Sequence, residues 1–178
     1  LGTLSDDDIE INVEKGVVYV SISDKLLFNS GSFTVTTRAK NVLEKIAKVI
    51  SDKPDLEFMV EGHTDNMLID QEKAAETIPG VLDNWDLSVK RATSVVRILQ
   101  NDYGVDPTKL VAAGRSFYMP IADNDSSVSR AVNRRTRIIV LPKLDQFTKL
   151  IEEGMSMNVP ATGPVSYTHL TLPTRRFV

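Results

Sequence analysis

The chain has 178 residues, of which 42% are hydrophobic and 25% are charged, with a formal net charge of -3 and no cysteine. These values are typical of one folded domain, and they exclude a collagen-like or disordered chain, disulfides and thiolate metal sites. Nucleic-acid binding needs a surplus of Lys and Arg on the binding face, so we expect no nucleic-acid partner.

Alternating apolar residues over 9–13 and 18–22 predict two strands joined by a turn at 14–16. Apolar residues at helical spacing over 35–50 predict an amphipathic helix that ends before Pro54. The next strand, from Leu56, ends at Gly62 and is followed by a polar loop.

The stretch 67–83 is polar and is predicted to be an insertion with one or two helical turns around 71–76. Asn84 is a suitable N-cap for a helix that continues towards Tyr103. The remaining pattern predicts, in order, a short strand at 110–114, a polar loop at 119–130, a strand at 136–141 and a short helix at 144–151.

This order predicts an α/β (α+β) two-layer sandwich, βαβαββ, with helices packed on one face of a mixed sheet. We assign residues 1–16 to a lead-in with the first strand, 17–154 to the domain, and 155–178 to a disordered or extended tail that resembles a non-native read-through. The chain shows no run of ~20 apolar residues and opens at Leu1 without a secretion signal. Membrane association is therefore expected to come from a missing amino-terminal region.

Asp65 lies in the loop after its strand, while Asn84, Leu87, Ser88 and Arg91 recur at spacings of three and four near a helix start. A carboxylate can accept from an ammonium group, and a guanidinium can grip a carboxylate in two bonds. Together with the free N–H groups of the helix start, this pattern favours recognition of an amino-acid-like end. The alternative is an exposed ion pair between Asp65 and Arg91, worth ~0–1 kcal/mol.

Three blocks carry a family resemblance: residues 60–66 (VEGHTDN), residues 84–88 (NWDLS) with Arg91-Ala92, and Asn124 with residues 133–135 (NRR). Over roughly residues 17–141 the chain resembles the OmpA-like peptidoglycan-binding domains, which include the carboxy-terminal part of a flagellar stator protein and peptidoglycan-associated lipoproteins. The resemblance implies that Asp65 and Arg91 clasp the diaminopimelate of the peptide stem. The other residues that it implies line or support this site are Thr64, Asn84, Leu87, Ser88, Asn133, Arg134 and Arg135, with one of the two arginines pointing inward.

The resemblance thus implies non-catalytic binding of peptidoglycan by a periplasmic chain, tethered to the outer membrane. The long insertion and the NWDLS run favour a flagellar-stator-type anchor at the inner membrane as an alternative. A homodimer is left open as an oligomeric state.

A less favoured alternative is a peptidoglycan or metal-dependent hydrolase that uses His63 and Asp65, with Ser88 as a conceivable nucleophile. The sequence has no nucleophile elbow, and His63 lacks the further ligands that zinc requires. We therefore expect no catalytic residue, no metal and no cofactor. Trp85 is expected to anchor packing, with stacking on a sugar ring as the alternative.

Overall fold

A computed structural model describes residues 8–14, 16–29 and 32–142. The predicted helix at 144–151, the tail at 155–178 and the domain end at 154 lie outside the described residues. Among the helices that are described, none is both long and apolar enough to cross a membrane.

Five strands form one sheet in the order β1-β2-β5-β3-β4. The β3–β4 pair is parallel, and the β1–β2, β2–β5 and β3–β5 pairs are antiparallel. The predicted mixed sheet is therefore confirmed. The strands are β1 (Ile9–Glu14), β2 (Val17–Ser23), β3 (Leu56–His63), β4 (Leu110–Gly114) and β5 (Arg135–Pro142).

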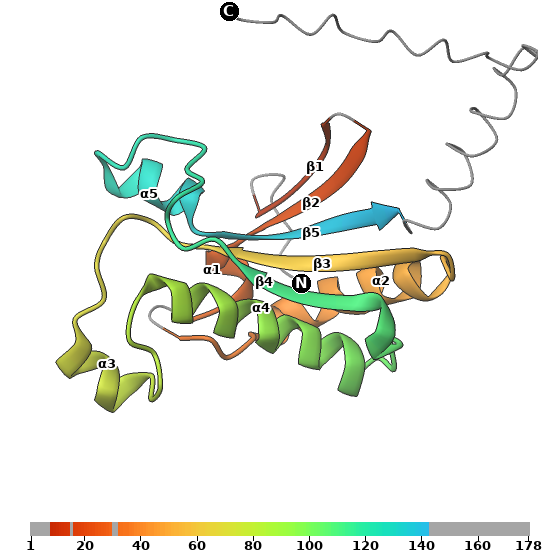
Figure 1. The fold of residues 1–178 in the computed structure, drawn as a ribbon, viewed down its shortest axis with the longest axis horizontal. Helices are drawn as coiled ribbons and strands as arrows, with labels where there is room; N and C mark the ends of the chain where they lie inside the picture. The colour runs from red at the N-terminus through yellow and green to blue at the C-terminus, as the bar shows by residue number, and fades with distance from the viewer. Residues whose placement is uncertain (1–7, 15, 30–31, 143–178) are drawn as a thin grey trace, which may run out of the picture. The chain divides into compact units, whose positions relative to one another are not determined.

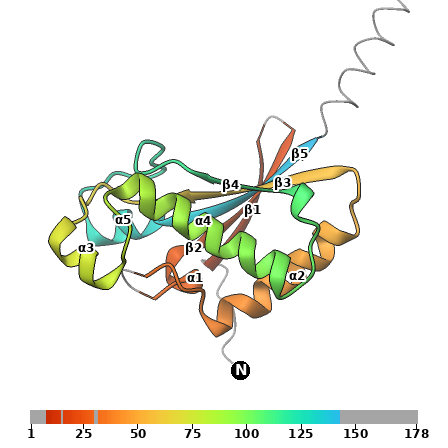
Figure 2. The ribbon, with the colours of Figure 1, turned by 60° about the horizontal axis from the view of Figure 1, so that its bottom comes forward.

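The longer helices cover one face of this sheet, as predicted (Figure 1; Figure 2). A 3₁₀ turn at Pro107–Lys109 leads from the second long helix into β4. The helices are α1 (Asp24–Leu27), α2 (Thr37–Ser51), α3 (Gln71–Thr77), α4 (Asn84–Asn101) and α5 (Ser127–Asn133).

The core forms between the sheet and the apolar faces of α2 and α4. In α2, Thr36 caps the first turn by accepting from the N–H of Ala39, and apolar residues three and four apart turn inward. They meet Val60 and Ile138 of the sheet and Val95 of α4, all nearly inaccessible to solvent. Burial of this layer fixes both helices on the sheet.

Two local expectations differ from the structure. The N-cap of α4 is Asp83, not Asn84, because the Asp83 carboxylate accepts from the N–H groups of Trp85 and Asp86. The loop predicted at 119–130 contains the start of α5, which Ser126 caps. The strand predicted at 9–13 is confirmed as β1, which pairs with β2 at the edge of the sheet.

The central strand β5 brings three chain segments to one edge of the sheet. Arg135, its first residue, lies opposite Ser23 of β2 on one side and opposite His63 of β3 on the other. Both neighbours run antiparallel to β5, so their last residues meet its beginning. Residues that follow β2 and β3, and the residue that precedes β5, are consequently neighbours in space.

The start of α4 approaches this edge closely at Gly62. A methyl group at Gly62 would overlap the backbone carbonyl of Ser88, which cannot yield without moving the helix. We predict that Gly62→Ala destabilises the fold by ~1–3 kcal/mol, or more, by overpacking. Urea denaturation of the two proteins measures this difference.

Gly16→Ala is the matched control for that substitution. Gly16 has φ +80°, and an added methyl there meets nothing within 4 Å. Its cost should be the strain of left-handed backbone alone, roughly 1–2 kcal/mol, with no effect on ligand binding. Equal stability of wild type and Gly62→Ala would contradict the tight approach of α4.

Candidate functional site

A hollow of about 680 Å³ opens at the sheet edge where β2 and β3 end and β5 begins. Two carboxylates and three basic side chains lie among its lining residues, which leaves an excess of one positive charge. We call it the charged hollow. Its lining residues are Asp24, Lys25, Phe28, Asn29, Asp65, Arg91, Ala131 and Arg134.

Asp65 and Arg91 line this hollow together, as the sequence predicted, but they do not pair with each other. Arg91 Nη1 lies 2.9 Å from Asp24 Oδ1, and Arg134 Nη1 lies 2.6 Å from Asp65 Oδ2. The expectation of an exposed Asp65–Arg91 ion pair was therefore wrong. Two separate ion pairs, both partly or largely buried, face one cavity.

Arg91 is held from several sides. Its Nε donates to the carbonyl of Ser32 at 3.1 Å, and its guanidinium lies 5.2 Å from the centre of the Phe28 ring. Its side chain is 5% exposed. Burial lowers the pKa of Arg91 and raises the pKa of Asp24, and their mutual attraction opposes both shifts. The guanidinium is therefore fixed in place before any ligand arrives.

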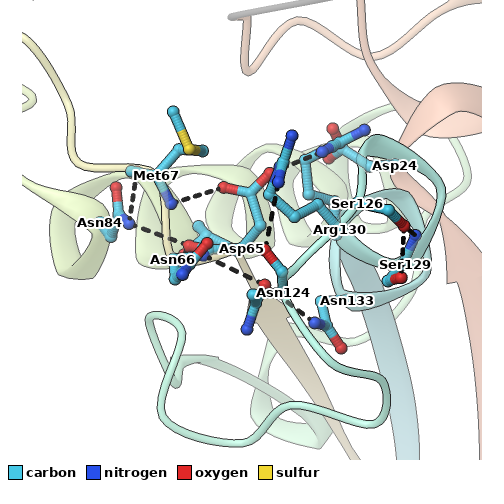
Figure 3. A network of polar contacts seen from close by, with 12 residues as sticks. Asp24, Asp65, Asn66, Met67, Asn84, Asn124, Ser126, Ser129, Arg130 and Asn133 are labelled. Atoms are coloured by element: carbon cyan, nitrogen blue, oxygen red, sulfur yellow. Dashed lines mark hydrogen bonds and ion pairs between the residues drawn. The ribbon is translucent and has the colours of Figure 1, made fainter.

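Asp65 is positioned by its own loop and by α4 (Figure 3). Its Oδ1 accepts from the N–H of Met67 at 3.1 Å, and its carbonyl accepts from Asn84 Nδ2, also at 3.1 Å. The same Asn84 group donates to the carbonyl of Met67, and Thr64 Oγ1 donates to the Asp65 carbonyl. Asn84 and Thr64 thus support the loop that presents the carboxylate.

Asn133 and Asn124 hold the neighbouring loop. The Asn133 side chain accepts from the N–H groups of Ile121 and Ala122 and donates to the carbonyl of Ala122. It also donates to Asn124 Oδ1, which accepts from the N–H of Asn66 at 3.4 Å. Asn133 is 1% exposed and does not line the charged hollow. Its contacts are those of a loop support.

The two arginines at the start of β5 have different roles. Arg134 lines the charged hollow, whereas the buried Arg135 donates to the carbonyls of Asn133 and Met119. Arg134 is the C-cap of α5 and precedes β5, whereas Arg135 is the first residue of β5 and lies between Ser23 and His63 in the sheet. Of the two candidates, Arg134 is the one that points inward.

Leu87 and Ser88 belong to α4 and are not among the residues that line the charged hollow. Leu87 packs with Ala74, Ile78 and Val81 of the insertion. Ser88 is fully buried, donates to the carbonyl of Trp85 and accepts from the N–H of Ser116. Both contacts tie α4 to the segments around it.

A buried acid–base cluster lies beneath the loop of Asp65. His63 Nε2 contacts Glu61 Oε1 at 2.9 Å, and Arg115 Nε donates to Glu61 Oε2 at 2.8 Å. His63 Nδ1 is buried without a hydrogen-bond partner. Burial lowers the pKa of His63, and the hydrogen bond with Glu61 opposes this shift. His63 is the last residue of β3, and its ring contacts Glu61 of the same strand.

Glu61 behaves differently from an isolated buried acid. Burial alone would raise its pKa, but the hydrogen bonds from His63 and Arg115 outweigh burial and lower it to about 2. Within the described residues, no group of three or more His, Asp or Glu side chains is arranged to hold a metal ion.

Asp24 is the functional candidate that sequence reasoning missed. It directly follows the alternating strand 17–23, as Asp65 follows shortly after the strand 56–63. The same signal, an acidic residue just beyond a strand, was therefore present in both places. The sequence alone did not show that both strands pair with β5, which is what brings the two acidic residues together.

Comparison of this sequence with known proteins identifies its family. The sequence model of the OmpA family matches residues 27–134. The chain therefore belongs to the OmpA family, and the predicted resemblance to the OmpA-like peptidoglycan-binding domains is confirmed.

Two curated relatives illustrate the range of this family. The chain is 27% identical to Motility protein B of Bacillus subtilis over 135 residues, which are 76% of this chain and 49% of that protein. It is 31% identical to Outer membrane protein Omp38 of Acinetobacter baumannii over 137 residues, which are 77% of this chain and 35% of that protein. The chain thus spans about half or less of the length of these relatives.

Solved structures share the fold. The periplasmic domain of Helicobacter pylori MotB has a TM-score of 0.69 and 25% identity, covering 85% of this chain and 93% of that one. The cell wall anchor of the T6SS from Pseudomonas aeruginosa has a TM-score of 0.64 and 31% identity, covering 76% and 89%.

Acid should destabilise the protein through the buried cluster. The pKa values of His63 and Glu61 lie below their ordinary values of 6.5 and 4.5, so the unfolded chain binds more protons in acid. Their contribution to stability is complete above pH 6.5 and is lost as pH falls, first through His63 and then, towards about 2, through Glu61. Unfolding free energies measured across this range check the order. His63→Gln should remove the earlier loss and also reduce the later one, because His63 helps to lower the pKa of Glu61.

Removing Asp24 should leave the Arg91 guanidinium buried without its partner. We predict that Asp24→Ala lowers the free energy of unfolding by ~3–5 kcal/mol, as for other broken buried pairs. Asp102→Ala is the matched control, because Asp102 pairs with Lys40 at the surface and should matter little. Similar stabilities of the two variants would show that the Asp24–Arg91 pair is not an important buried contact.

Proposed function

We propose that the charged hollow binds the diaminopimelate residue of the peptidoglycan stem peptide and so anchors this chain to the cell wall. The observation that carries the proposal is the convergence of the Asp24–Arg91 and Asp65–Arg134 pairs on one cavity. Each pair offers one acceptor and one donor group. A ligand end with both an ammonium and a carboxylate group complements this arrangement.

Binding would exchange contacts within the protein for contacts with the ligand. Asp65 would accept hydrogen bonds from the ammonium group of the ligand. The carboxylate of the ligand would accept hydrogen bonds from Arg91 and Arg134. Arg134 has a side chain 36% exposed, against 5% for Arg91. Arg134 is therefore the arginine that can move towards the ligand, whereas the side chain of Arg91 is already fixed in position.

The solved structures that share the fold support a wall-anchoring role, since they include a cell wall anchor and the periplasmic domain of MotB. We place this chain in the periplasm, tethered to the outer membrane as the name of Omp38 suggests for that relative. The stator-type alternative places it at the inner membrane, and the similarity to Motility protein B favours it.

We propose binding without turnover. The hydrolase alternative would use His63 and Asp65, with Ser88 as a conceivable nucleophile, and each of these already has a partner. His63 contacts Glu61, Asp65 pairs with Arg134, and Ser88 bonds to Trp85 and Ser116. Their contacts support the fold of the site. The hydrolase alternative is testable through release of soluble fragments.

The test is co-sedimentation with purified insoluble peptidoglycan that contains diaminopimelate, followed by analysis of the supernatant for released muropeptides. Asp65→Asn and Arg91→Ala should each weaken binding by ~2–5 kcal/mol, since each removes one partner of a charged contact. Arg97→Ala, which removes an exposed arginine of the same helix, is the matched control and should bind as wild type.

Peptidoglycan with lysine in place of diaminopimelate tests the ligand itself. Lysine has the ammonium group but lacks the second carboxylate, so wild type should bind this wall far more weakly. Equal binding to both walls would overturn the diaminopimelate assignment. Retained binding by both site variants would place the wall contact elsewhere, and release of muropeptides by wild type would favour the hydrolase.

A further inference from the structure

A second hollow, of about 270 Å³, has Asn84 among its lining residues. It is bordered by exposed aromatic rings: Trp85 is 45% exposed and Tyr118 is 61% exposed. Their ring centres are 5.5 Å apart, and Phe117 stacks on Tyr118 at 4.5 Å. We call it the aromatic hollow. Its lining residues are Leu68, Ile69, Gln71, Leu82, Asp83, Asn84, Trp85, Ser116, Phe117 and Tyr118.

The backbone segments that carry the rings are held by several hydrogen bonds. Asp83 caps α4 and fixes the backbone of Trp85. Ser116, just before the other two rings, has φ 52° and is 1% exposed. Its N–H donates to Ser88 Oγ, and its carbonyl accepts from the N–H of Thr64. A strained, buried residue of this kind persists only where its surroundings enforce it.

Packing within the protein does not account for these side chains. Leu68 and Leu82, from the insertion, are 81% and 65% exposed beside the rings. The exposed carboxamide of Gln71 and the exposed carboxylate of Asp83 lie among the same lining. Flat apolar ring faces beside polar groups of this type match a saccharide, whose C–H face covers a ring while its hydroxyls form hydrogen bonds.

Asn84 connects the two hollows. It lines the aromatic hollow, and its Nδ2 donates to the carbonyls of Asp65 and Met67 in the loop that presents the charged hollow. The two hollows are therefore linked through one side chain, which makes a ligand that carries both a sugar and a charged peptide the natural one to test.

We propose that the aromatic hollow is a subsite for the glycan part of peptidoglycan, with Trp85 and Tyr118 as its stacking platform. This inference rests on the function proposed for the charged hollow. The charged hollow supplies the recognition of the peptide, and the aromatic hollow adds affinity for a stem that still bears its sugars.

Trp85 is the single tryptophan of the chain, so its fluorescence reports directly on this hollow. The experiment titrates the protein with two soluble ligands, a diaminopimelate-containing stem peptide with its disaccharide and the same peptide without sugar. Both should bind by calorimetry, but only the sugar-bearing ligand should change the Trp85 fluorescence. Its affinity should be higher by about three- to tenfold, the range expected for one aromatic contact.

Variants separate a sugar contact from a structural one. Trp85→Ala and Tyr118→Ala should remove the advantage of the sugar-bearing ligand and leave binding of the sugar-free peptide unchanged. Tyr118→Phe keeps the ring and should retain most of the advantage. Val128→Ala, a 75% exposed position on α5, is the control and should change neither affinity.

Two outcomes would overturn the inference while leaving the proposed function intact. One is equal affinity of wild type for both ligands, and the other is equal weakening of both ligands by Trp85→Ala. If wild type binds neither ligand, the proposed function itself fails, and the glycan subsite fails with it.

Discussion

The arrangement of the site depends on the antiparallel pairing of β5 with both of its neighbours. Arg135 has Ser23 and His63 as its register partners on the two sides, so the next residues of β2 and β3 and the previous residue of β5 meet. A shift of one residue in either pairing would turn every side chain of that strand to the other face. The backbone N–H of Asp24 donates to the carbonyl of Arg134, which extends the pairing one step beyond the strands.

The charges at this edge balance each other in pairs, which explains how so many can be buried. Burying an ion without a partner costs several kcal/mol, in the order of the ~3–5 kcal/mol seen when buried pairs are broken. Here each carboxylate has a guanidinium within a hydrogen-bond distance, and each pair faces the same cavity. In the free protein, these carboxylates and guanidinium groups are therefore paired with each other, and they are the groups that a zwitterionic ligand would require.

Much of this arrangement could be predicted from sequence, because periodicity and turn residues determine the strands and the two long helices. The family blocks also placed Asp65, Arg91 and Asn84 at one edge. The pairing of Arg91 with Asp24, and not with Asp65, could not be predicted, since Asp24 and Arg91 are brought together only by sheet pairing. Helix α5 was missed because Val128 and Val132 are exposed and give no buried apolar face. The cap was misassigned because Asp83 and Asn84 are both good capping residues.

The position of the N-cap at Asp83 determines what the side chain of Asn84 does. With Asp83 as the N-cap, the Asn84 side chain is released from capping and instead holds the carbonyls of Asp65 and Met67. Asn84 thereby becomes the residue that joins the loop of the charged hollow to the lining of the aromatic hollow. Ser88, one turn further along α4, accepts from Ser116 and so ties the segment with the aromatic rings to the same helix. Both hollows therefore depend on the position of the first two turns of α4. That position is set in turn by the close approach to Gly62 and Gly114, where a side chain would displace the helix from the sheet.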